Sequence, residues 1–60
     1  MLYEVTFEKN EVCQSNLVET EKSPVEIGHY FRDVKKTTYV FAIKIATSDS
    51  MRIGKPIIKL

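Results

Sequence analysis

Few residues of this 60-residue chain have the types and spacing that catalysis requires. It contains one histidine, His29, which the helix predicted below places on its solvent side, and one cysteine, Cys13, which falls in a strand. General acid–base catalysis needs a second positioned polar group and a pocket, and the sequence indicates neither. No base can be assigned to Cys13, because the only histidine belongs to a different layer. We therefore expect a surface histidine, a cysteine that packs as a small hydrophobe, and no enzymatic activity.

The acidic residues are scattered rather than grouped at the spacing of a metal-binding loop. A single cysteine and a single histidine leave a structural zinc site without its usual ligands and make an internal disulfide impossible. The sequence Gly54-Lys55-Pro56 lacks the spacing of a phosphate-binding loop and is typical of a turn. We expect no metal, no cofactor and solvated carboxylates at the acidic positions: Glu4, Glu8, Glu11, Glu19, Glu21, Glu26, Asp33 and Asp49.

Basic residues gather near the end of the predicted helix and recur in the last loop. If the fold brings both regions together, they form a basic patch that can meet phosphates or an acidic protein: Arg32, Lys35, Lys36, Arg52 and Lys55. The formal net charge is only +1, and the aromatic residues fall on core-facing stripes, which leaves few for base stacking. Nucleic-acid binding is therefore the alternative function rather than the leading one.

The length of the chain gives room for one domain, residues 1–60. A domain of this size buries only roughly 60% of the surface that its unfolded chain exposes, so its stability is marginal. Small folds compensate with disulfides, a metal or association, and association is the remedy that this sequence leaves. Charged residues interrupt the apolar ones near Met1, which predicts neither a signal peptide nor a membrane span. With its lone thiol, the chain is expected to be cytoplasmic.

The centre of the chain, Ser23-Pro24-Val25-Glu26, has the signature of a helix start. The serine can accept a hydrogen bond from the backbone three residues on, the proline suits the first helical position, and the glutamate can reach back. Four apolar residues then recur at i, i+3, i+4 and i+7 and predict one stripe that packs on a sheet: Ile27, Tyr30, Phe31 and Val34. Gly28 is either a tolerated flaw in this helix or the mark of a close approach.

Alternation of Tyr3, Val5 and Phe7 with charged and polar residues predicts a first strand with one buried face. A turn at Lys9-Asn10-Glu11 leads to a second strand, about residues 12–20, whose register depends on the turn length. A two-residue loop that pairs Phe7 with Val12 leaves Gln14 and Asn16 on the core side. A three-residue loop gives better burial, because it pairs Phe7 with Cys13, Val5 with Ser15 and Tyr3 with Leu17, and we predict this register.

Residues 38–47 predict the strongest strand, with Tyr39, Phe41, Ile43 and Ile45 on one face and Val40, Ala42, Lys44 and Ala46 on the other. Apolar residues on nearly both faces favour a central position in the sheet. Either one helical turn or a compact loop over residues 47–54 leads to a last strand, residues 56–60, whose proline suits a strand start or an edge. The predicted fold is a two-layer α+β domain of order β-β-α-β-β, with an antiparallel four-stranded sheet of order 2-1-3-4 and one helix on one face.

One helix cannot cover both faces of such a sheet. The second face is expected to carry small and branched apolar side chains: Val12, Val18, Val40, Ala42, Ala46 and Ile57. Either a wet face tolerates these side chains or a partner covers them, and we predict a self-associating, non-enzymatic module that acts by binding another protein. The expected contacts lie on this face, on the last strand and in the last loop: Val40, Ala42, Ile57, Leu60, Met51 and Arg52.

Overall fold

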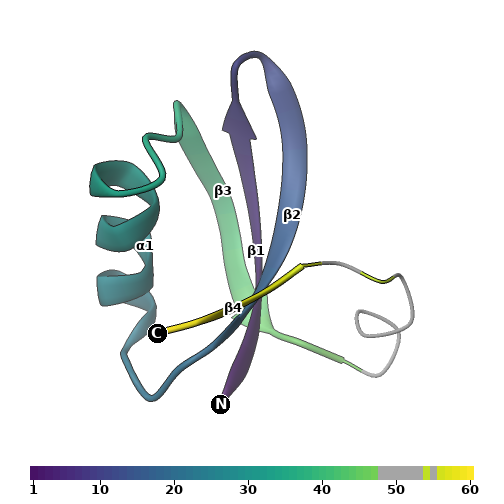
Figure 1. Ribbon diagram of the computed structural model, residues 1–60, viewed down its shortest axis with the longest axis vertical. Coiled ribbons are helices and arrows are strands. Elements are labelled where there is room, and N and C mark those ends of the chain that lie inside the picture. Colours follow the sequence, from purple (N-terminus) through teal and green to yellow (C-terminus); the bar gives the residue numbers. More distant parts are fainter. Residues whose placement is uncertain (48–53, 55) are drawn as a thin grey trace.

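The computed structural model describes residues 1–47, 54 and 56–60 of the chain. One helix packs beside a four-stranded sheet (Figure 1), so the predicted α+β class is confirmed. The elements follow the predicted order β-β-α-β-β: β1 (Leu2–Lys9), β2 (Val12–Glu19), α1 (Pro24–Asp33), β3 (Tyr39–Ile45) and β4 (Ile57–Lys59).

The start of α1 is confirmed as a capping box. The Ser23 hydroxyl accepts from the Glu26 backbone N–H at 3.4 Å, while the Glu26 carboxylate accepts from the Ser23 N–H at 3.2 Å. Both contacts satisfy backbone donors that a helix start leaves without an intrahelical partner. Ile27 and Phe31 are fully buried. Val34 was expected in the same stripe, which is wrong: it caps the helix end and is 62% exposed.

The core lies between α1 and one face of the sheet. Ile27 and Phe31 pack with three buried residues of β1 and β2: Val5, Phe7 and Val18. The rings of Phe7 and Phe31 lie 5.1 Å apart between centroids, within the range in which aromatic pairs attract beyond simple burial. Val18 therefore faces the helix, and its predicted place on the opposite face is wrong.

The hairpin between β1 and β2 has a two-residue loop, Asn10-Glu11, so the predicted three-residue loop is wrong. Both loop residues have positive φ, 53° and 65°, as a type I′ turn requires. The twist of this turn matches the twist of the flanking strands. This match decides the register, although the predicted three-residue loop would bury more apolar residues. Phe7 pairs with Gln14 as a result. Cys13 pairs with Glu8 and is exposed, so the expected buried cysteine is also wrong.

The strand order is β3-β1-β2-β4 rather than the predicted 2-1-3-4. As predicted, β1 lies between β2 and β3 and is antiparallel to both. The last strand, however, lies beside β2 and parallel to it, so the sheet is mixed rather than antiparallel. Ile58 packs against the core from this position, and the Leu17 N–H donates to the Pro56 carbonyl at 2.9 Å. The burial of Ile58 and the backbone pairing with β2 explain why β4 lies beside β2 rather than beside β3.

An irregularity in the β1–β3 pairing divides the apolar residues of β3. Thr6 pairs with Ala42 but Phe7 pairs with Val40, so Phe41 is an extra residue without a partner on β1, as in a β-bulge. Val40 consequently shares the face of Phe7 and packs against the core, which makes its predicted place on the second face wrong. β3 is an edge strand and not the predicted central one, because β4 pairs elsewhere.

The conformation of Glu11 yields the first prediction. Its φ of 65° is unfavourable for a residue with a Cβ, whereas Asn-Gly is the preferred pair in this turn. We expect Glu11→Gly to raise the free energy of unfolding by about 1 kcal/mol. Chemical denaturation would measure it, with Glu11→Ala as a control that removes the carboxylate but keeps the strain. Equal stability of the two variants would contradict a strained turn.

Gly28 yields the second prediction. A Cβ built on this residue would meet the Ile43 side chain at 3.8 Å, which is an ordinary van der Waals contact. Glycine in a helix interior is destabilising relative to alanine, so Gly28→Ala should stabilise the protein by about 1 kcal/mol. Thermal and denaturant melts would measure the change. A loss of stability would instead indicate a close approach between α1 and β3 that only glycine permits.

Candidate functional site

The side of the sheet opposite α1 is the strongest candidate for a functional surface, and we call it the open face. Paired residues of neighbouring strands point to the same side of a sheet, so the register defines its members. β1 contributes Leu2, Glu4, Thr6 and Glu8; β2 contributes Cys13, Ser15, Leu17 and Glu19; β3 contributes Tyr39, Ala42 and Lys44; and β4 contributes Ile57 and Lys59. Two of these side chains, Glu4 and Leu17, are buried.

An aromatic pair dominates the exposed apolar surface of the open face. Tyr39 is 62% exposed and Phe41 is 54% exposed, and their ring centroids lie 5.0 Å apart. Because Tyr39 pairs with Glu8, the ring of Phe41 beside it also belongs to the open face. We refer to Tyr39 and Phe41 as the aromatic pair.

The aromatic pair was expected on the core-facing stripe of β3, which is wrong. Strict alternation along residues 39–45 places Tyr39 and Phe41 with Ile43. The bulge shifts this alternation by one residue, so that Ile43 pairs with the buried Val5 while the two aromatic side chains face outward. A pattern of period two contains no signal for such a shift.

The other expected contact residues are divided between three places. Ala42 and Ile57 lie on the open face and are exposed, as expected. Val40 lies on the opposite side against the core. Leu60 follows β4, where its N–H donates to the Glu19 carbonyl at 3.0 Å. Met51 and Arg52 fall outside the described residues.

The charged residues of the open face are mixed in sign. Glu4, only 7% exposed, is paired with Lys44 through contact between its carboxylate and Nζ at 3.3 Å. Glu8 and Glu19 add two carboxylates, and Lys59 adds an ammonium group opposite Glu19. Carboxylates outnumber cations among these described positions, which therefore carry no excess of the positive charge that phosphate binding requires.

The described members of the predicted basic patch lie around the end of α1. The Arg32 guanidinium pairs with Asp33 at 3.1 Å and contacts Nδ1 of His29 at 2.9 Å. His29 is on the exposed surface, as expected. Lys35 and Lys36 follow the helix, where Lys36 has a φ of 57° and the next N–H, of Thr37, donates to the Phe31 carbonyl. Arg52 and Lys55 lie outside the described residues.

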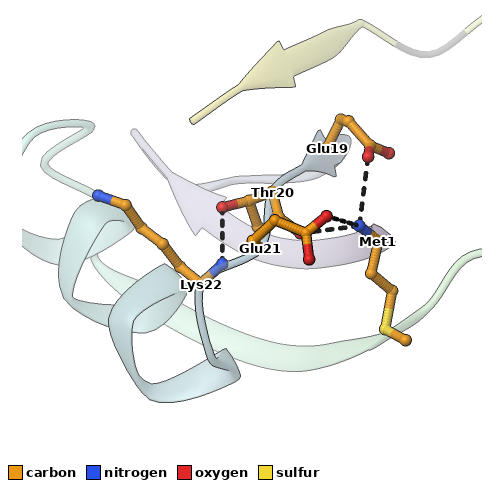
Figure 2. Close-up of polar contacts among 5 residues, drawn as sticks. All are labelled: Met1, Glu19, Thr20, Glu21 and Lys22. Carbon is orange, nitrogen blue, oxygen red and sulfur yellow. Dashed lines mark hydrogen bonds and ion pairs between the residues drawn. The ribbon is translucent and has the colours of Figure 1, made fainter.

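A second polar cluster joins the start of β1 to the segment after β2 (Figure 2). The Met1 ammonium donates to the Glu19 carboxylate at 3.2 Å, the Thr20 carbonyl at 2.9 Å and the Glu21 carboxylate at 3.4 Å. The Thr20 N–H returns a bond to the Met1 carbonyl at 3.0 Å. The hydrogen bonds that the Met1 ammonium donates to Glu19 and, less strongly, to Glu21 raise its pKa above the ordinary value of 8.0, although desolvation opposes them.

The described part of the chain contains no pocket and no group of three or more residues placed to hold a metal ion. Within the same residues, no helix is long and apolar enough to cross a membrane. The chain matches no protein-family model, and it shows no match to a curated protein or to a solved structure.

The Met1 cluster yields the third prediction. An ammonium whose pKa is raised by folding stabilises the folded state fully below about pH 8, and this contribution is lost as the pH rises through the folded pKa. We therefore expect the melting temperature of a chain with a free Met1 amine to fall slightly above pH 8. Glu19→Gln should reduce this fall, with Glu26→Gln as a carboxylate control outside the cluster. Identical pH profiles for all three proteins would contradict the role of Glu19.

Proposed function

We propose that this chain is a non-enzymatic binding module that associates with itself and acts by binding another protein on its open face. The observation that carries the proposal is the exposure of the aromatic pair on a strand of the sheet rather than in a loop. Tyrosine and phenylalanine are enriched at the centres of protein interfaces, where a partner excludes water from them. Complete burial of such a side chain contributes about 1.5–3 kcal/mol.

The surroundings of the aromatic pair support a protein partner. The short side chains of Ala42 and Thr6 lie beside the aromatic pair. Glu8 and Lys44 place charged groups on either side of them along the strands. An apolar centre with a charged rim is the usual composition of a protein interface. Ile57, 54% exposed on β4, adds a separate apolar side chain at the other edge of the sheet.

Nucleic-acid binding is the second candidate, and the aromatic pair gives it one supporting observation. Exposed rings on a sheet can stack with unpaired bases, provided that cations follow the phosphates. The described cations of the predicted patch, Arg32, Lys35 and Lys36, are near the end of α1 instead, and Arg32 is already paired with Asp33. The carboxylates Glu4 and Glu8 border the rings on β1. These charges favour a protein over a polyanion.

A site-specific cross-link tests the proposed function. A photoreactive phenylalanine derivative would replace Phe41 in one variant and Val25, which is 69% exposed on α1, in a matched control. After irradiation in the cells that produce the protein, we expect protein adducts from position 41 at a yield several-fold above that from position 25. Nuclease-sensitive adducts at position 41 would support the second candidate instead. Equal yields from both positions would overturn the open face as a binding site.

A further inference from the structure

The open face is covered at one end and exposed at the other. Glu4 of β1 and Leu17 of β2 pair with each other and are buried, although they point away from the helix. The residues nearest the hairpin are open to solvent instead, apart from a half-buried glutamate. We call this region the hairpin end, and its members come from three neighbouring strands: Tyr39, Phe41, Glu8 and Cys13.

The hairpin end contains one carboxylate and no cation. Glu8 is its charged residue, and it forms no ion pair with any residue that the structure describes, Lys36 in the connection from α1 included. Lys9 belongs to the helix side of the sheet, because strand neighbours alternate. Lys44 contacts Glu4, which is about 13 Å from Glu8 along β1. Among the described residues, therefore, nothing neutralises the Glu8 carboxylate.

The aromatic pair adds a second source of attraction for a cation. The face of an aromatic ring carries partial negative charge, so a cation within about 6 Å of the ring centroid is attracted to it. Tyr39 lies directly opposite Glu8 in the register, and the Cβ atoms of such a pair are about 5 Å apart. One cation can therefore contact the Tyr39 ring and the Glu8 carboxylate together, whereas both groups would repel an anion.

Arginine suits this arrangement better than lysine does. Its planar guanidinium stacks on a ring face, while the N–H groups at its edge donate to a carboxylate. The centroids of the Tyr39 and Phe41 rings lie 5.0 Å apart, so the second ring is within reach of the methylene stem, which packs on apolar surface. A lysine ammonium is compact and more strongly hydrated, and it gains less from the rings.

We propose that the protein partner of the open face presents an arginine to the hairpin end. The guanidinium stacks on Tyr39 and donates to the Glu8 carboxylate, and the aliphatic stem lies on Phe41. This inference rests on the proposed function, since it names the chemistry of the partner that the function requires. It places the contact at the exposed end of the open face, away from the buried Glu4 and Leu17.

An NMR titration with a blocked pentapeptide, in which glycines flank one central arginine, tests the inference. We expect the ring protons of Tyr39 and Phe41 to shift and to saturate in the millimolar range. A citrulline peptide, which keeps the planar group but not the charge, should cause no saturable shift, and a lysine peptide should bind more weakly than the arginine peptide. Glu8→Gln and Phe41→Leu should each weaken arginine binding by about threefold. Glu21→Gln, which neutralises a 96% exposed carboxylate beside Met1, should leave it unchanged.

Equal affinities for the arginine and citrulline peptides, or for the unsubstituted chain and Glu8→Gln, would overturn the arginine contact. The cross-link from position 41 separates this result from a failure of the proposed function. Adding Glu8→Gln to that photoreactive variant should lower the yield of protein adducts several-fold. An undiminished yield would support the proposed function while contradicting the arginine. A yield from position 41 no higher than that from position 25 would overturn the proposed function and the arginine contact with it.

Discussion

The structure depends on the fact that one ten-residue helix can cover only one face of a four-stranded sheet. α1 contributes two fully buried side chains, Ile27 and Phe31, and they pack with Val5, Phe7 and Val18. Since these contacts form the buried cluster on the helix side among the described residues, any apolar residue that points the other way must find a different cover or stay in water. The composition of the open face follows from this constraint.

The bulge in β3 determines which apolar residues of this strand point away from the helix. It allows Val40 and Ile43 to face the core while the larger side chains of Tyr39 and Phe41 point outward. The aromatic pair is therefore exposed because of the strand pairing and not because the strand lacks apolar residues. A sheet without the bulge would place Phe41 and Ile43 on one face and remove the feature on which the proposed interface depends.

The position of β4 determines which strands form the two edges of the sheet. β4 pairs with the edge of β2, where Ile58 adds to the core and Ile57 to the open face. No other strand in the described part of the chain pairs with the outer edge of β3, and the bulge disfavours an added strand there. In Figure 1 the helix lies along β3, whereas β4 pairs in parallel with β2 at the opposite edge of the sheet. Any binding is thereby directed toward the face of the sheet.

The sequence by itself determined the elements that depend on local chemistry. Ser23, Pro24 and Glu26 specify the start of α1 because a capping box acts within four residues. Alternation from Tyr3 to Phe7 specifies β1, and the same reasoning placed Ala42 and Ile57 on the open face. These features depend on side chains close in sequence, and they needed no knowledge of the neighbouring strands.

Only the tertiary structure decided the register, the bulge and the neighbour of β4. The two left-handed residues Asn10 and Glu11 set the register through the twist of the hairpin, which a count of buried positions did not detect. The outward direction of Phe41 depends on how β3 pairs with β1, and the place of β4 depends on which edge offers an apolar anchor. The last two outcomes are competitions between contacts distant in sequence, so no local pattern along residues 39–60 encodes them.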